Sequence, residues 1–197
     1  MPQILLWLSL NYIEVIGALS GIIGVWLTAR QIIWCWPVAL VNVVIYIYVF
    51  YVSKLYADFG LQLFYFIMTL YGWYNWLYGG TENHLLPISR ITLKKFFIFF
   101  FIGMPAVFVA GYLLRNYSDA AYPYWDSFVS VWGIIGTYMM AKKIIEHWML
   151  WIIVDITCVT IYFFKGLYAT SILYFIFTIL AVYGWSNWKK DLRIQIS

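Results

Sequence analysis

Charged residues divide this chain into uncharged apolar stretches, and that division limits what the chain can fold into. No charged residue lies between Arg30 and Lys54, between Lys95 and Arg115, or between Lys165 and Lys189. A helix needs about 20 mainly apolar residues to cross a bilayer, and these stretches have that length. The mean hydropathy is +0.84 and only 10% of the residues are charged, against roughly 25% in a soluble domain. We therefore expect an integral membrane protein.

The same pattern predicts an all-α fold with seven transmembrane helices. They are expected near Tyr12–Ala29, between Arg30 and Lys54, between Asp58 and Gly79, between Lys95 and Arg115, and near Pro123–Ala141, Trp148–Phe164 and Tyr168–Trp188. An odd number of spans places the two termini on opposite sides of the membrane. Nine of the 12 Lys and Arg residues fall in loops on the C-terminal side. Because positive loops stay in the cytoplasm, we expect the N-terminus outside and the C-terminus inside.

An internal repeat organises the chain. Tyr71-Gly-Trp-Tyr-Asn-Trp76 recurs as Tyr183-Gly-Trp-Ser-Asn-Trp188, and we call the step from Tyr71 to Tyr183 the repeat offset. The same offset aligns Trp36 with Trp148, and it also aligns short motifs in the other two predicted helices of each half. We expect a first three-helix repeat in residues 1–80, a linker with the fourth helix in 81–120, a second repeat in 121–188 and a cytoplasmic tail in 189–197. The fourth helix makes the two repeats parallel, a 3+1+3 arrangement in which substrates bind between the halves.

Several classes of function are excluded by missing motifs. The chain has no Gly-rich phosphate loop and no H-E-x-x-H, G-x-S-x-G or C-x-x-C motif. A retinal photoreceptor is excluded because no lysine lies between Gly166 and Trp188. His84 and His147 are predicted to be exposed loop residues. We predict no catalytic residues, no metal, no cofactor and no nucleic-acid partner.

One acidic residue stands out within a predicted span. Asp155 shares a helical face with Trp148 and Trp151, because the spacing is i, i+3, i+7. A carboxylate is costly in hydrocarbon, so an acid at this depth is a candidate functional residue. Aromatic rings beside an acid suit a cationic guest that carries a ring. The alternative is a structural Asp that bonds a neighbouring helix.

Other polar residues within the spans are candidate hydrogen-bonding partners for a substrate: Asn42, Gln62, Tyr183 and Asn187. The same residue types often bond neighbouring helices instead, and this alternative stays open for Asn75 and Asn187. Trp76 and Trp188, near helix ends, are predicted to be interfacial belt residues.

These motifs resemble the PnuC family of bacterial vitamin transporters over nearly the full chain. The matching pieces are Ile13-Glu-Val-Ile-Gly17, Leu55-Tyr-Ala57, Tyr71-Gly-Trp-Tyr74, Tyr124-Trp-Asp-Ser127, Trp148-x-x-Trp151-x-x-x-Asp155 and Lys165-Gly-Leu-Tyr168. The resemblance implies a SWEET-like fold in the bacterial inner membrane. It also implies facilitated diffusion of a small unphosphorylated vitamin that a cytoplasmic kinase then traps.

The resemblance also bears on the substrate. The family's type substrate is nicotinamide riboside, and related branches carry thiamine, riboflavin or deoxynucleosides. Its nicotinamide riboside carriers line the site with W-x-x-W-x-x-x-N, whereas this chain has Asp155 in the Asn place. An acid there would also suit thiamine, whose thiazolium ring is cationic.

We expect a uniporter for a cationic vitamin, with alternating access between the two repeats. Trp148 and Trp151 would stack the ring and Asp155 would balance its charge. Three alternatives remain open: a thiamine carrier of the same fold, a substrate-binding subunit or sensor that needs a partner, and proton-coupled import through Asp155. Besides the vitamin and the lipid bilayer, a second copy of the chain in a homo-oligomer is left open.

Overall fold

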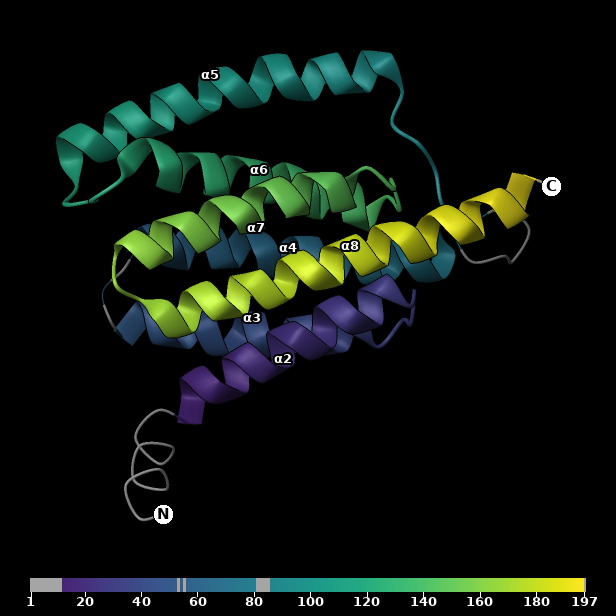
Figure 1. Ribbon diagram of the computed structural model, residues 1–197, viewed down its shortest axis with the longest axis horizontal. Coiled ribbons are helices and arrows are strands. Elements are labelled where there is room, and N and C mark those ends of the chain that lie inside the picture. The colour runs from purple at the N-terminus through teal and green to yellow at the C-terminus, as the bar shows by residue number, and fades with distance from the viewer. Residues whose placement is uncertain (1–11, 53, 55, 81–85, 197) are drawn as a thin grey trace.

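The computed structural model describes residues 12–52, 54, 56–80 and 86–196, with no account of the side chains of residues 12–14, 56, 57 and 196. Within these ranges the chain forms seven α-helices (Figure 1). They are α2 (Tyr12–Ala29), α3 (Cys35–Val52), α4 (Tyr56–Tyr78), α5 (Leu93–Tyr117), α6 (Pro123–Ala141), α7 (His147–Phe164) and α8 (Tyr168–Ile196). The all-helical class predicted from the sequence is confirmed.

Most helices begin and end where the charge pattern predicts. α8 is the exception, because it continues through the predicted tail to Ile196. Four helices of the described chain are long and apolar enough to cross a membrane, at Cys35–Val52, Leu93–Tyr117, His147–Phe164 and Tyr168–Gln195. Val15–Ala29 is a shorter apolar helix. The chain is therefore a multi-pass membrane protein.

Local sequence sets several helix ends. Pro123 occupies the first turn of α6, where its missing N–H removes no helical hydrogen bond. The hydroxyl of Thr92 caps α5 by accepting a hydrogen bond from the backbone N–H of Lys95 at 3.3 Å. Gly166, between α7 and α8, adopts a φ of 74°, which glycine tolerates without strain.

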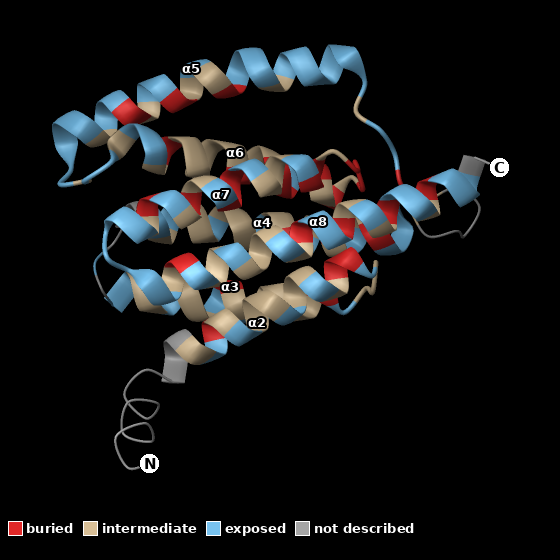
Figure 2. Cartoon of the chain, in the orientation of Figure 1, coloured by how far each residue is buried: buried red, intermediate tan, exposed pale blue. Residues whose placement is uncertain are grey.

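Six helices form a closed ring in the order α2, α3, α4, α6, α7, α8, with α8 packed back against α2. α5 lies outside the ring and packs on α6 (Figure 1). The helices run roughly along one direction, so the ring has two ends. We call the end where α2 begins the N-terminal end, and the end where α8 finishes the C-terminal end. Figure 2 shows the outer side of α5 exposed, as expected for a surface that faces lipid.

The buried core lies toward the C-terminal end of the ring. Four tryptophans form its centre: Trp36, Trp76, Trp148 and Trp188. The rings of Trp76 and Trp188 lie 5.8 Å apart between centroids, and the Trp148 and Trp188 rings are also 5.8 Å apart. This cluster fills the ring at that end.

Two kinds of hydrogen bond in the core each occur twice, once in each half of the chain, at positions related by the repeat offset. The amide of Asn75 donates to the carbonyl oxygen of Ala141 at 2.8 Å, and that of Asn187 donates to Ala29 at 2.9 Å. The acceptors are the last carbonyls of α6 and α2, which have no partner within their own helices. Each asparagine therefore ties its own helix to a helix of the other half of the chain.

The tryptophans that follow these asparagines repeat the pattern. The indole N–H of Trp76 donates to the carbonyl oxygen of Met140 at 3.1 Å, and that of Trp188 donates to Thr28 at 3.0 Å. Backbone geometry repeats as well, since the left-handed φ of 55° at Gln31 matches the 49° at Lys143. We refer to Asn75, Trp76, Asn187 and Trp188 as the Asn–Trp cluster.

Candidate functional site

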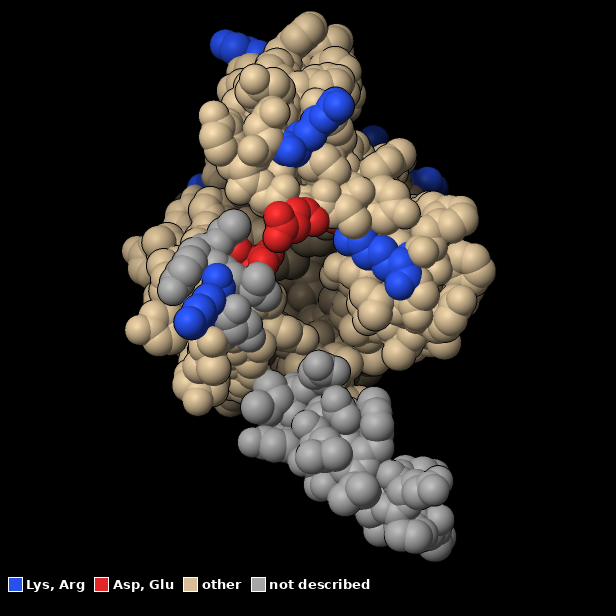
Figure 3. Space-filling view, turned by 90° about the vertical axis from the view of Figure 1, so that its left-hand side faces the viewer, with Lys and Arg blue, Asp and Glu red and all other residues tan. Residues whose placement is uncertain are grey.

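The ring is hollow at its N-terminal end. Figure 3 views that end and shows a depression at its centre, with acidic side chains at the rim. Asp126, in the first turn of α6, lies 3.7 Å from the ammonium of Lys165, which follows α7. Asp58 lies in the first turn of α4 at the same end. The ring is therefore open to a small polar molecule at one end and filled by tryptophans at the other.

Asp155 lies on α7 and is 4% exposed. Among the residues that the structure describes, its carboxylate has neither a hydrogen-bond partner nor an ion-pair partner. Cys158 and Tyr174 lie within electrostatic range of it. A buried carboxylate without a partner is costly, and a cationic ligand would remove that cost. The structural alternative, an Asp that bonds a neighbouring helix, has no such bond in its favour.

Trp151 lies one turn from Asp155 toward the C-terminal end and is half-buried. Its indole packs against α6, where a Cβ built on Gly136 would come within 3.3 Å of it. A Cβ built on Gly133 would come within 3.8 Å of the same indole. The two glycines leave room for this indole beside the backbone of α6.

Trp148 has a different environment from Trp151. It is 2% exposed and packs against Gly184 of α8, and the ring of His147 lies 4.5 Å from it. In this conformation its indole is enclosed by the tryptophan core and offers no open face for stacking. A stacking role for Trp148 therefore stays a prediction that requires the core to open.

Two predicted hydrogen-bonding residues are engaged by the protein itself. The amide of Asn42 donates to the carbonyl oxygen of Gly17 at 2.9 Å and to the hydroxyl of Ser20 at 2.8 Å. The amide of Asn187 belongs to the Asn–Trp cluster. In this conformation both join helices, as the alternative interpretation of these residues expects.

Gln62 and Tyr183 lie in different surroundings. Gln62 is half-buried on α4, and its amide has no hydrogen bond within the described chain. Tyr183 lies on the exposed side of α8, with a relative exposure of 41%. Of the predicted polar set, Asp155 and Gln62 thus have side chains without a hydrogen bond in the described chain.

Two expectations about aromatic residues were wrong. Trp76 and Trp188 are not interfacial belt residues, because both are buried and donate hydrogen bonds to helix-end carbonyls. His147 is not an exposed loop residue; it is the first residue of α7 and has no exposed surface. Its ring lies between those of Trp148 and Trp188, and its Nδ1 is 2.7 Å from the carbonyl oxygen of Ile144. His84 lies outside the described residues.

The spacing i, i+3, i+7 places Tyr65 on one helical face with Gln62 and Thr69, a polar and aromatic stripe typical of a binding cavity, although Tyr65 was not among the predicted substrate-binding residues. Its hydroxyl oxygen would lie 2.7 Å from a Cβ built on Gly133, so the side chain reaches from α4 to α6. The repeat carried a signal, because Gly133 corresponds to Gly21, and a Cβ built there would meet Phe177 at 3.1 Å. Phe177 in turn corresponds to Tyr65.

A buried lysine lies at the C-terminal end. Lys143 is 5% exposed, and its ammonium donates to the side-chain oxygen of Gln31 at 3.3 Å and lies 4.5 Å from the ring centre of Trp76. The amide of Gln31 then donates to Asp191 at 2.6 Å. Burial lowers the pKa of Lys143 to about 8, although Cys35 and Asp191 oppose the shift. This polar chain joins the loop after α2, the loop after α6 and the end of α8.

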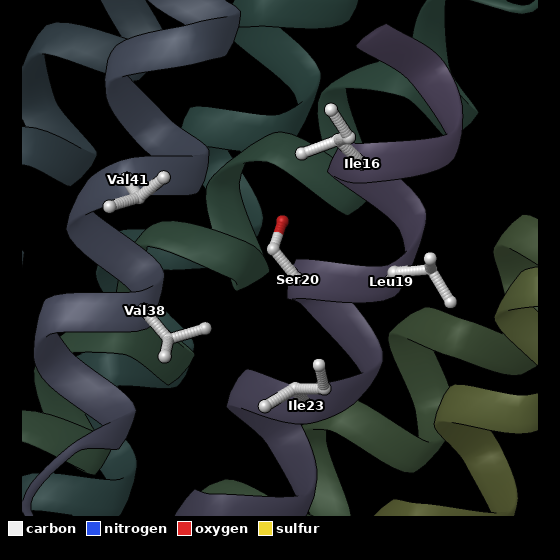
Figure 4. A pocket seen from close by; sticks show the side chains of 6 residues that line it. All are labelled: Ile16, Leu19, Ser20, Ile23, Val38 and Val41. Carbon is white, nitrogen blue, oxygen red and sulfur yellow. The ribbon is translucent and has the colours of Figure 1, made fainter. Parts of the chain in front are cut away.

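An apolar groove of about 340 Å³ lies between α2 and α3 (Figure 4). Five of its six lining residues are aliphatic, and the sixth is Ser20, whose hydroxyl donates to the carbonyl oxygen of Gly17. Ile16, Leu19 and Val41 on its walls are exposed. The groove therefore suits a lipid tail and lacks the polar groups that a water-soluble vitamin requires.

A helical ring in the membrane that is hollow at one end, with an interior acid that has no partner in the described chain, is the arrangement expected of a small-molecule transporter. Residues 11–190 match the model of the nicotinamide mononucleotide transporter family, and the chain belongs to that family. PnuC, the nicotinamide riboside transporter of Escherichia coli, is 30% identical over 94% of this chain and 88% of its own.

Two further comparisons agree. The riboflavin/roseoflavin transporter RibM of Streptomyces davaonensis is 24% identical over 91% of this chain and 87% of its own. The crystal structure of the vitamin B3 transporter PnuC superposes with a TM-score of 0.75, covering 98% of this chain and 87% of that one at 23% identity. The chain therefore has the fold of a vitamin transporter and belongs to a family of nicotinamide riboside and vitamin transporters.

Proposed function

We propose that this protein imports a water-soluble cationic vitamin of the nicotinamide riboside type by facilitated diffusion. The observation that carries the proposal is Asp155, a buried carboxylate without a hydrogen bond or ion pair in the described chain, beside Trp151. A pyridinium ring would stack on the indole while its charge faces the carboxylate. The relatives that are nicotinamide riboside transporters support this substrate.

The scaffold is proposed to be two parallel three-helix units, SWEET-like, with α5 as the linker between them. The first unit contains α2–α4 and the second α6–α8, and a pseudo-two-fold axis along the membrane normal relates them. The doubled hydrogen bonds of the Asn–Trp cluster support this arrangement, because the repeat offset relates each pair of partners to its equivalent. In such folds the substrate binds between the halves.

The orientation is proposed to place the C-terminal end of the ring in the cytoplasm of a bacterial inner membrane. Arg30, Lys142 and Lys143 lie in loops at that end, and Lys94 and Lys189 lie in the ends of α5 and α8 there. Positively charged loops favour the cytoplasmic side. The hollow of Figure 3 would then face outward, and the conformation would be open to the outside.

Transport is proposed to alternate access between the two ends of the ring. With the outer end open, the Asn–Trp cluster closes the inner end through hydrogen bonds that all join the first unit to the second. Inward opening must break them as the units rock apart. Each is a single neutral bond worth about 1 kcal/mol net, so the closed state can exchange with an open one.

Trapping by a cytoplasmic kinase is consistent with the electrostatics of the site. A phosphorylated vitamin carries negative charge, which would face Asp155 inside the ring. Like charges in a medium of low dielectric repel strongly, so a phosphorylated product would not re-enter. Net import would then follow from metabolism without coupling to an ion.

Thiamine is the second candidate substrate. The observation in its favour is the carboxylate of Asp155 at a position where the resembling nicotinamide riboside carriers have an asparagine amide. A carboxylate accepts hydrogen bonds but donates none when ionised, so it cannot bind a carboxamide oxygen as asparagine can. A thiazolium ring requires only the negative charge.

The test is uptake by the purified protein in liposomes, with nicotinamide riboside, thiamine and riboflavin measured side by side. We expect saturable entry of a cationic vitamin without ATP, an ion gradient or any partner protein. Neutral riboflavin should compete weakly. Binding without flux would contradict the uniporter and support a substrate-binding subunit or sensor.

A further inference from the structure

Some interior positions of the ring are polar in one half of the chain and apolar at the equivalent position of the other half. The repeat offset pairs positions on α4 and α7 with positions on α8 and α3. Asp155 on α7 corresponds to Val43 on α3, and both are buried. Thr69 on α4 corresponds to Ala181 on α8, and both are again buried. At these two pairs the polar residue lies on α4 or α7, whereas Tyr174 on α8 is polar like its counterpart Gln62 on α4.

Tyr65 and Phe177 form the most informative of these pairs, because their contacts are also equivalent. The end of the Tyr65 side chain would meet a Cβ on Gly133 of α6 at 2.7 Å, and the end of the Phe177 ring would meet a Cβ on Gly21 of α2 at 3.1 Å. Each ring thus packs onto the first helix of the other half. Only the hydroxyl of Tyr65 distinguishes the two positions.

The hydroxyl of Tyr65 has no hydrogen-bond partner among the described residues, as is also true of the carboxylate of Asp155. Tyr174 of α8 lies within electrostatic range of both, so the three groups share the interior of the ring. The indole of Trp151 lies beside the same Gly133 that Tyr65 contacts. A hydroxyl and a carboxylate that make no hydrogen bond within the described chain are available to a polar ligand.

We propose that the substrate binds off the pseudo-two-fold axis, against a recognition wall formed by Tyr65, Trp151 and Asp155. Trp151 stacks the cationic ring, Asp155 faces its charge, and the Tyr65 hydroxyl forms a hydrogen bond with a hydroxyl or amide substituent of the vitamin. The equivalent positions on the opposite side of the ring, Phe177 and Val43, provide only apolar contact. The proposal rests on the proposed function and assigns Tyr65 as its substrate-positioning residue.

The chain offers a matched pair of substitutions to test the wall. Tyr65→Phe removes only the hydroxyl and makes the position identical to its counterpart, while Phe177→Tyr adds a hydroxyl to the opposite wall. Nicotinamide riboside and thiamine are titrated calorimetrically into each purified protein, and thermal unfolding is measured without ligand. We expect Tyr65→Phe to weaken binding roughly fivefold to tenfold, the value of one neutral hydrogen bond. Phe177→Tyr should change binding by less than about twofold, since the substrate does not contact that position.

The double variant Tyr65→Phe/Phe177→Tyr moves the hydroxyl to the other wall and should bind as weakly as Tyr65→Phe. Restored affinity in the double variant would overturn the off-axis site, as would wild-type affinity in Tyr65→Phe. If wild type and Tyr65→Phe unfold at the same temperature without ligand, the loss of affinity in Tyr65→Phe does not come from a destabilised fold. Wild-type protein that binds neither vitamin would contradict the proposed function itself, whereas binding unaffected by Tyr65→Phe contradicts only the recognition wall.

Discussion

The side-chain amide of Asn187 donates a hydrogen bond to the carbonyl oxygen of Ala29, which lies 158 residues earlier in the chain. The bond satisfies a carbonyl at the end of α2 that has no partner in its own helix. It also joins the last helix of the ring to the first at the C-terminal end. Stability and the closure of the C-terminal end of the ring therefore depend on the same contact.

The first prediction concerns that contact. Asn187→Ala should lower the free energy of unfolding by about 1 kcal/mol and increase opening of the C-terminal end. The buried thiol of Cys35 lies in the core at that end and reports on opening. In a Cys158→Ala background, a maleimide should label Cys35 several-fold faster in the variant.

Asn116→Ala is the matched control for this experiment. The amide of Asn116 bonds only to the carbonyl oxygen of Tyr112 within its own exposed helix end, so its loss should leave the labelling rate unchanged. If Cys35 reacts equally fast with and without the Asn187 amide, the contact does not hold the C-terminal end of the ring closed.

The second prediction concerns close approach between helices. A Cβ on Gly184 would lie 2.6 Å from the indole of Trp148, which is enclosed and cannot move away. Gly184→Ala should therefore destabilise the protein by about 1–3 kcal/mol. A Cβ built on Gly60 would meet no atom within 4 Å, so Gly60→Ala should stabilise α4 by about 0.5–1 kcal/mol. Thermal unfolding of both variants measures the contrast, and a stable Gly184→Ala protein would contradict the packing.

The third prediction follows from the pKa of Lys143, which burial lowers from 10.5 to about 8. Between these values the unfolded chain binds the proton and the folded chain does not, so stability rises with pH. Below pH 8 both states are protonated, and the full cost of the buried charge is present. The unfolding temperature should therefore rise between about pH 8 and 10.5 relative to a protein without this group.

Lys143→Gln supplies that reference, because it places at position 143 the residue found at the equivalent Gln31. The variant should be the more stable protein at pH 7, and the difference should shrink toward pH 10.5. Lys142→Gln, at the half-buried neighbouring position, controls for the general loss of a positive charge. If the unfolding temperatures of wild type and Lys143→Gln change in parallel with pH across this range, the pKa of Lys143 is not lowered.

The sequence was sufficient to predict the helices, because charges are excluded from the spans and Pro37 and Pro123 mark helix starts. It was also sufficient to find Asp155, since an acid in an apolar stretch is conspicuous. It failed for Trp76 and Trp188, which look like interfacial residues because they lie near helix ends. Their actual partners are backbone carbonyls in the other half of the chain, and hydropathy carries no information on those.

For the same reason, the sequence alone could not separate the amides that bond a neighbouring helix from those that are free to bind a substrate. Asn42 and Gln62 are both amides within predicted spans, yet the first bonds to α2 and the second has no bond in the described chain. Which amide is free depends on the rotation of each helix and on its neighbours. Periodicity gives the face of one helix but not the residue opposite, so it places Tyr65 beside Gln62 and Thr69 but does not predict its contact with Gly133 of α6.

The most direct test of the account is nicotinamide riboside and thiamine flux through Asp155→Asn in liposomes, with binding measured on the same protein from pH 5 to 9. Asparagine is nearly isosteric, so the substitution removes charge and leaves the packing in place. We predict that wild type transports at least one of these cations alone and that Asp155→Asn binds thiamine, which has no carboxamide for the asparagine to bind, at least about tenfold more weakly, a loss of about 1.4 kcal/mol. Undiminished binding and flux in Asp155→Asn at every pH would contradict both the charge-balancing role and proton coupling through this residue.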